Sequence, residues 1–420
     1  MNNLSRLFKN FFPLFLLKAF EYLVPLIVVP YLVTTLGVGG FGTMSIALST
    51  AYFLAMVTNY GFELTATREI AINKTNLKKV SKIYSTVFTT KLLLLLLSFL
   101  LLNLGLIILN INKGEWFLIY TAFTYVIGSA LFPVWLFQGL EKMKYITIIN
   151  IIPRIIFTLL LFILVKQEVD IMYAVLLQST PLALSGIISV FIIKRNLSIR
   201  YKFPEMKDIA SCLKSGFSVF LSSFMTFILA SSAVLFLGFF ANREVVGAYS
   251  ALEKLIKAVI SLFNPVFQVL FPFISEKFNE SEDLGKQSLI QISKVLIPLT
   301  ILITVIIITN SREILLVMYG NEYIKFDYGF KLLTFWFLFS IINNVVGIQY
   351  LIGSGRQKIY TFCFVITALA TLILFCILIP LYGLYGAILT VVIGELVLTV
   401  AIIIAVCKLN FLNKKLFYTK

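Results

Sequence analysis

The residues of this chain that could best take part in binding or chemistry are charged side chains that fall deep inside long apolar segments. A charge at the centre of a membrane helix costs roughly 2.5–3.5 kcal/mol to insert and usually faces water or the bundle interior. Leaving Glu395 aside, the cations outnumber the anions, which favours a wet cavity that attracts an anion over internal ion pairs that fix helix register. The residues are Lys18, Glu21, Arg154, Glu253, Lys254, Lys257 and Glu395.

The spacing of these charges predicts which of them share a helix face. Lys18 and Glu21 are three residues apart, and Glu253 and Lys257 are four apart, so each pair lies on one face. Arg154 directly follows Pro153, a residue that loosens the helical hydrogen-bond ladder. Glu395 is alone on its segment, which leaves two interpretations: a carboxylate that couples transport to an ion, or a carboxyl hydrogen-bonded within the bundle.

Other polar positions in the apolar segments have weaker signals. Lys91 and Lys294 lie near segment ends, where a lysine side chain can extend to water. Four amides are candidates for hydrogen bonds to the hydroxyls of a sugar, the alternative being hydrogen bonds between helices. These candidate sugar contacts are Gln138, Gln268, Asn343 and Gln349.

The composition excludes an ordinary water-soluble enzyme. Of 420 residues, 60% are hydrophobic and only 13% charged, and the mean hydropathy is +0.99. The chain has no histidine, its four cysteines form no CxxC pair, and no phosphate-binding GxxxxGK[ST] sequence occurs. These features predict a carrier rather than an enzyme, with no metal and no cofactor.

The apolar segments predict an all-α integral membrane protein with twelve transmembrane helices, because each is about the 20 residues that span a bilayer. They run apolar on every face, unlike the short alternating strands of a membrane barrel. The predicted spans are 12–35, 42–63, 84–110, 116–138, 146–165, 171–193, 217–240, 246–272, 290–310, 331–352, 359–379 and 384–407.

The basic residues predict the orientation of these spans. With the N-terminus inside, 23 of the 35 lysines and arginines fall in cytoplasmic segments and six in outer loops. This bias follows the positive-inside rule and places both termini in the cytoplasm. Topology also accounts for the net charge of +16, so nucleic acid is not expected as a partner.

The longest predicted cytoplasmic connection, 194–216, divides the chain into halves of six spans each. Gly42-Thr-Met-Ser45 and Gly247-Ala-Tyr-Ser250 both open the second span of their half, and Gln138 corresponds to Gln349. Six is an even number, so the second half enters the membrane from the same side as the first. We therefore predict two pseudo-symmetric six-helix bundles, 1–208 and 209–420, around a central cavity that opens alternately to each side.

Several short motifs, taken in order, resemble the Wzx-type polysaccharide flippases of the multidrug/oligosaccharidyl-lipid/polysaccharide exporter superfamily. They cover about two-thirds of the chain, and the last three spans match mainly in hydropathy. Where the family often has an arginine before the Leu36-Gly37 pair, this chain has Thr34. The motifs are Pro30-Tyr-Leu32, Phe41-Gly42, Tyr60-Gly-Phe62, Ala66-Thr-Arg-Glu-Ile-Ala71, Pro133-Val-Trp-Leu-Phe-Gln-Gly-Leu-Glu141, Val246-Gly-Ala-Tyr-Ser-Ala-Leu-Glu-Lys-Leu255, Pro265-Val-Phe-Gln268 and Phe271-Pro272.

The resemblance implies a flippase for undecaprenyl-diphosphate-linked oligosaccharide, such as an O-antigen repeat unit, in the bacterial inner membrane. The anionic diphosphate suits the cations Lys18, Arg154, Lys254 and Lys257, while Glu21, Glu253 and Glu395 are the candidate coupling or ion-pair carboxylates. Membrane lipid and polysaccharide polymerase machinery are the expected partners. The alternatives are a cation-coupled multidrug exporter, a lipid II flippase and, from a different class, a non-transporting membrane scaffold.

Reporter fusions test the predicted orientation. Fusions at Lys113, Lys202 and Lys325 are expected to report outside, inside and outside, because the basic residues concentrate in the alternate connections. An alkaline phosphatase and green fluorescent protein pair at each position gives the measurement, and one inverted position would contradict the topology.

Overall fold

The computed structural model describes the backbone of residues 3–418 and the side chains of residues 24–408, and these residues form helices without a strand. Eleven helices within the described residues are long and apolar enough to cross a membrane. The fold is therefore the all-α membrane architecture that the sequence predicts. The count of twelve spans stays a prediction, since the first two predicted spans, 12–35 and 42–63, fall within one assigned helix.

The chain divides into two compact units, Met1–Phe227 and Ile228–Lys420, which are described separately below. α8 passes through the boundary between them. The predicted halves, 1–208 and 209–420, stay a prediction. The helices that begin in the first unit are α1 (Asn3–Asn59), α2 (Phe62–Ile72), α3 (Leu77–Ile108), α4 (Lys113–Leu131), α5 (Val134–Gly139), α6 (Met143–Leu164), η1 (Glu168–Asp170), α7 (Ile171–Asn196) and α8 (Met206–Ser231).

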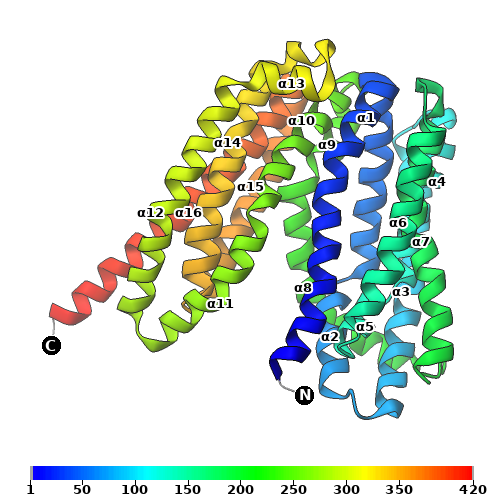
Figure 1. Cartoon of the computed structure of the whole chain (residues 1–420), viewed down its shortest axis with the longest axis horizontal. Helices are drawn as coiled ribbons and strands as arrows, with labels where there is room; N and C mark the ends of the chain where they lie inside the picture. Colours follow the sequence, from blue (N-terminus) through cyan, green and yellow to red (C-terminus); the bar gives the residue numbers. More distant parts are fainter. Residues whose placement is uncertain (1–2, 419–420) are drawn as a thin grey trace. The chain divides into compact units, whose positions relative to one another are not determined.

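The first unit begins with a helix that reverses direction. α1 contains a non-helical residue, Gly37, with a φ of 66°, a backbone conformation that glycine adopts at little cost. Figure 1 shows the blue chain running along one arm and returning along the other. The arms correspond to the first two predicted spans, and α1 packs against α3, α4, α6 and α7.

Two motifs behind the family resemblance meet in the first unit, where α2 packs on α5. Gly139 approaches α2 so closely that a Cβ there would lie 2.7 Å from the Cβ of Ile70. The Thr67 hydroxyl donates to the backbone carbonyl of Trp135, and Lys74 forms an ion pair of 2.7 Å with Glu141. The motifs therefore encode one helix–helix contact.

Pro133 breaks the fourth predicted span into α4 and α5 and frees a backbone carbonyl. A proline has no N–H, so the carbonyl of Ser129, four residues earlier, loses its helical donor. The ammonium of Lys91 on α3 donates to this carbonyl at 2.6 Å, and Lys91 is only 2% exposed. The expectation that Lys91 extends to water from a span end was therefore wrong, because the freed carbonyl holds the side chain inside the unit.

Pro153 has the same consequence in α6. It removes the donor for the carbonyl of Ile149, and the hydroxyl of Ser185 on α7 donates to that carbonyl at 2.8 Å. Backbone polar groups in a bilayer core have no water to bind, so a neighbouring helix must satisfy those that a proline frees.

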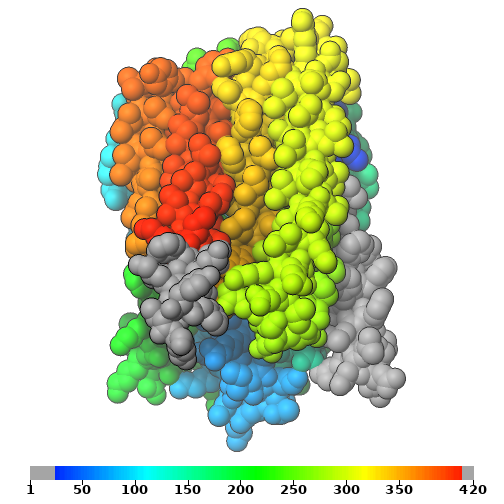
Figure 2. Space-filling view, turned by 90° about the vertical axis from the view of Figure 1, so that its left-hand side faces the viewer, coloured from blue at the N-terminus to red at the C-terminus, as the bar shows by residue number. Residues whose placement is uncertain are grey.

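The second unit holds a row of four long helices. α15 packs on α16, α16 on α14, and α14 on α12, and Figure 2 shows this row on one face. Short α13 and η2 join α12 to α14. The elements of this unit are α9 (Ala233–Phe240), α10 (Arg243–Leu262), α11 (Asn264–Glu280), α12 (Glu282–Thr309), α13 (Ser311–Tyr319), η2 (Asn321–Phe326), α14 (Asp327–Asn343), η3 (Asn344–Ile352), α15 (Gln357–Tyr382) and α16 (Leu384–Tyr418).

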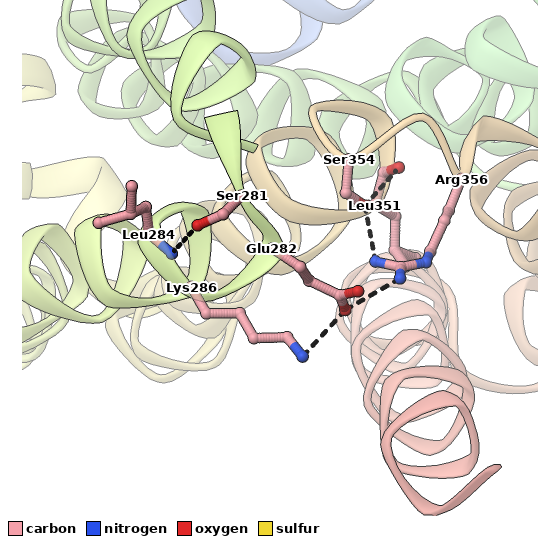
Figure 3. Close-up of polar contacts among 7 residues, drawn as sticks. All are labelled: Ser281, Glu282, Leu284, Lys286, Leu351, Ser354 and Arg356. Carbon is pink, nitrogen blue, oxygen red and sulfur yellow. Dashed lines mark hydrogen bonds and ion pairs between the residues drawn. The ribbon is translucent and has the colours of Figure 1, made fainter. Parts of the chain in front are cut away.

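An ion-pair cluster joins two connections of the second unit. Glu282, at the start of α12, accepts from Lys286 at 2.9 Å and from Arg356, just before α15, also at 2.9 Å (Figure 3). Arg356 also donates to the hydroxyl of Ser354. The α11–α12 turn and the turn before α15 therefore lie at the same end of the unit, as their predicted cytoplasmic assignment requires.

Replacing Lys91 tests the carbonyl contact. Lys91→Met fills the same space without a donor, so the Ser129 carbonyl is left without its partner. We expect a loss of about 1–3 kcal/mol of stability, the usual cost of an unsatisfied buried polar group, measured as a lower melting temperature of the purified protein. Lys113→Met, at an exposed helix start, is the control; equal melting temperatures for the two variants would contradict this role.

Candidate functional site

The four predicted diphosphate-binding cations fall in different parts of the structure. The side chains of Lys18 and Glu21 lie outside the described residues. Arg154 is half-buried on α6 in the first unit, within electrostatic range of Tyr52 on α1. Lys254 and Lys257 are half-buried on α10 in the second unit. That the four cations share one cavity stays a prediction.

α10 carries a buried carboxylate paired with a partly exposed lysine. Lys257 Nζ lies 3.1 Å from Glu253 Oε1, one helical turn away, as the four-residue spacing predicts. The carboxylate is buried, but the lysine side chain remains 36% exposed. Lys257 therefore has an internal partner, and part of its side chain remains exposed.

Trp336 on α14 contacts the same lysine from another direction. The Lys257 ammonium lies 5.7 Å from the centre of the indole ring, within the range of a cation–π interaction. The indole N–H donates to Glu395 Oε1 at 3.1 Å. One side chain thus contacts Lys257 with its face and Glu395 with its edge.

Glu395 on α16 is alone on its segment but has several partners in the fold. Its second oxygen, Oε2, accepts from Asn343 Nδ2 at 2.6 Å. The Thr399 hydroxyl donates to Asn343 Oδ1 at 2.7 Å, so both the nitrogen and the oxygen of the Asn343 amide are hydrogen-bonded. We call this set, from Glu253 through Lys257, Trp336, Glu395 and Asn343 to Thr399, the α10–α16 network.

The amides Gln268 and Gln349, both predicted sugar contacts, lie together. They line a pocket of about 360 Å³ in the second unit. Gln349 donates to Asn344 Oδ1 at 3.2 Å and to the Phe267 carbonyl at 3.3 Å. Its own Oε1 is buried and accepts no hydrogen bond among the described residues. The lining residues are Asn264, Phe267, Gln268, Phe271, Pro272, Asn344, Ile348 and Gln349.

The local structure explains how the pocket arises. The tenth predicted span changes from α-helix to π-helix at Asn344, and this wider turn carries Asn344 and Gln349. π-helical turns are rare and frequently mark functional sites. Opposite, α11 begins with Asn264-Pro265 and carries Gln268 and Phe271. The irregular backbone therefore gathers four amides from two helices.

The remaining predicted residue, Gln138, lies on α5 in the first unit, beside the α2–α5 contact. Asn343 is in the second unit, but it belongs to the α10–α16 network and does not line the pocket of Gln268 and Gln349. Sequence reasoning missed Trp336 and Thr399. Their signal was slight: Trp336 is one of three tryptophans, and Thr399 is one turn from Glu395.

Paired substitutions test the ion pair on α10. Lys257→Gln leaves the buried Glu253 carboxylate without its partner and is expected to cost about 1–3 kcal/mol of stability. Adding Glu253→Gln removes the uncompensated charge and is expected to restore most of the melting temperature. Lys277→Gln, in the exposed Lys277–Glu280 pair on α11, is the control and leaves the melting temperature unchanged. A double variant no more stable than Lys257→Gln would contradict the pairing.

Sequence comparison finds relatives along nearly the whole chain. The chain is 31% identical over 404 residues to a protein named "Putative O-antigen transporter" of Shigella dysenteriae, which covers 95% of this chain and 99% of the relative. It is 29% identical over 403 residues to a protein of the same name from Escherichia coli (strain K12), with 95% and 96% covered. The relatives are thus named as transporters, in agreement with the prediction of a carrier.

Two solved structures share the fold. One is an inward-facing multidrug resistance MATE family transporter of the MOP superfamily, with a TM-score of 0.70 and 13% identity, covering 93% of this chain and 96% of that one. The other is the lipid II flippase MurJ in an inward closed conformation, with a TM-score of 0.70 and 19% identity, covering 94% and 87%. At these identities the likeness shows the fold alone.

Residues 7–278 match the model of a family described as polysaccharide biosynthesis protein. This match covers more than half of the chain and includes most of the motifs that resemble the Wzx-type flippases. The chain therefore belongs to the polysaccharide biosynthesis protein family.

Proposed function

We propose that this chain is a flippase that moves an oligosaccharide linked to undecaprenyl diphosphate across the bacterial inner membrane by alternating access. The observation that carries the proposal is Lys257, a partly exposed cation inside a membrane helix of a chain whose relatives are named O-antigen transporters. An ammonium in a low-dielectric surrounding attracts an anion more strongly than it does in bulk water.

The proposed substrate matches the polar groups in three parts. The diphosphate is bound by Lys257 with Lys18, Arg154 and Lys254. The sugar hydroxyls contact the pocket that Gln268 and Gln349 line, with Gln138 and Asn343 as further candidates. The prenyl chain stays in the surrounding lipid.

The alternatives fit the second unit less well. A multidrug exporter that binds cationic drugs needs accessible carboxylates, whereas Glu253 is paired with Lys257 and both oxygens of Glu395 accept hydrogen bonds. A scaffold without transport activity does not require a partly exposed cation such as Lys257 inside a helix. Lipid II shares the diphosphate, but its flippase resembles this chain in fold alone.

Further elements of the proposal concern coupling and surroundings. Glu395 is the first candidate for ion coupling, because Trp336 contacts both Glu395 and Lys257. Glu253 and Glu21 are the further candidate carboxylates. Both termini lie in the cytoplasm, as the basic residues predict. The polysaccharide polymerase machinery is the expected partner for the translocated unit.

Deletion of the gene tests the function directly. We expect surface polysaccharide to disappear while lipid-linked units accumulate on the cytoplasmic side, and the intact gene is expected to restore the polysaccharide. The double variant Glu253→Gln/Lys257→Gln is expected to be present at normal abundance and yet give at least about tenfold less polysaccharide, since one lost charged contact is worth about 1.5–3 kcal/mol.

The control is Lys277→Gln/Glu280→Gln, which removes an exposed pair of the same charges on α11. It is expected to restore polysaccharide to the level of the intact gene. Normal polysaccharide with the α10 double variant at normal abundance would contradict diphosphate binding by Lys257 and favour the multidrug exporter.

A further inference from the structure

The first unit contains a second cationic site, at the end of α3 that the charge bias predicts to be cytoplasmic. A pocket of about 580 Å³ lies between the first turns of α3 and the segment that joins α7 to α8. Four cations and two carboxylates line it, so its side chains carry a net positive charge. The charged lining residues are Lys78, Lys82, Arg200, Lys202, Glu205 and Asp208.

The connecting segment is held rigidly along α3. Leu197 and Ile199 are buried in the hydrophobic core of the first unit, whereas Ser198 and residues 200–203 are exposed. The backbone N–H groups of Arg200 and Lys202 donate to the hydroxyls of Ser81 and Ser85, at 3.2 and 2.9 Å. The connection between α7 and α8 is thereby hydrogen-bonded to α3 at two backbone groups.

The next contact continues this ladder of hydroxyls. Tyr201 and Thr89 share a hydrogen bond of 2.8 Å, and Thr89 is one turn beyond Ser85 on the same face of α3. α3 therefore contacts the segment at three successive turns, twice at a backbone N–H group and once at the Tyr201 side chain. Fixing the backbone in advance lowers the entropy that a ligand must pay to order these side chains.

The cations of the pocket differ in their partners. Lys82 is oriented by an ion pair of 2.9 Å with Asp208. The side chains of Lys78, Arg200 and Lys202 make no ion pair within the part of the chain that the structure describes. Three of the four cations are therefore available to an anion, and a guanidinium with two ammonium groups is a typical set for phosphate.

Exposed apolar side chains lie in the same segments as the cations, and Leu77 and Phe203 line the pocket. Phe203 is 79% exposed and Met206 74% exposed, and Leu77 and Tyr201 are also exposed. Apolar and aromatic side chains beside lysine and arginine at the end of a membrane helix are typical of the lipid–water interface. A free phosphate ion would make no use of these apolar side chains, whereas the acyl chains of a lipid would pack against them.

We propose that this pocket binds the phosphate of an anionic phospholipid from the cytoplasmic leaflet. The phosphate contacts Lys78, Arg200 and Lys202, while the acyl chains lie along the apolar side chains of Leu77, Phe203 and Met206. Glu205 and Asp208 accept hydrogen bonds from headgroup hydroxyls such as those of phosphatidylglycerol. The site is separate from the residues of the proposed transport path and does not depend on the transported substrate.

Native mass spectrometry of the purified full-length protein in detergent tests this proposal, because a micelle has no anionic membrane surface of its own. Dioleoyl-phosphatidylglycerol is expected to bind more tightly than dioleoyl-phosphatidylcholine. Arg200→Gln/Lys202→Gln is expected to weaken phosphatidylglycerol binding about 25-fold, from about fivefold for each basic residue. Lys78→Gln alone, expected to weaken it about fivefold, serves if the double variant fails to fold.

The matched control is Lys194→Gln/Arg195→Gln, which removes two exposed cations from the end of α7 that do not line the pocket. It is expected to leave binding unchanged. Equal weakening by both double variants, or equal binding of the two lipids, would overturn the proposal. Displacement of phosphatidylglycerol by millimolar inorganic phosphate alone would assign the pocket to a soluble phosphate instead.

Discussion

A polypeptide in the hydrocarbon core of a membrane must supply hydrogen-bond partners for its own backbone, and this constraint shapes the whole chain. Continuous helices meet it locally. Where Pro133 and Pro153 interrupt the ladder, side chains from neighbouring helices complete it: Lys91 donates to the Ser129 carbonyl and Ser185 to the Ile149 carbonyl. The charge on Lys91 inside the first unit is thus explained by the backbone carbonyl that it contacts.

The same constraint applies to the charged groups of the second unit, which are mostly satisfied by one another. Glu253 holds Lys257, Trp336 lies against Lys257 and donates to Glu395, and Asn343 holds the other oxygen of Glu395. Among the described residues, Lys257 stays partly exposed and Gln349 Oε1 accepts no hydrogen bond. An anionic group and a hydroxyl donor are the ligand features that would match them.

The sequence predicted those parts of this arrangement that depend on local periodicity. Apolar runs located the spans, and the four-residue spacing placed Glu253 and Lys257 on one helix face. The ion pair that they form there is the interpretation that the surplus of cations disfavoured. The interactions that it missed join residues far apart in the chain. Glu395 looked solitary because Trp336 is 59 residues away, and Lys91 looked like a residue near water because Pro133 lies on another helix. The shared pocket of Gln268 and Gln349 likewise depends on a π-helical turn that apolar periodicity does not predict.

The central claim is that Lys257 binds a lipid-linked diphosphate during transport, and reconstitution tests it most directly. The purified protein is placed in liposomes that contain an undecaprenyl-diphosphate-linked oligosaccharide, and a membrane-impermeant glycosidase measures the fraction of sugar exposed outside over time. The account predicts that the intact protein brings nearly all of the sugar within reach of the glycosidase. Glu253→Gln/Lys257→Gln, inserted at the same density, should leave about half of the sugar protected from the glycosidase, as liposomes without the protein do. Equal exposure by the intact protein and this variant would contradict the claim.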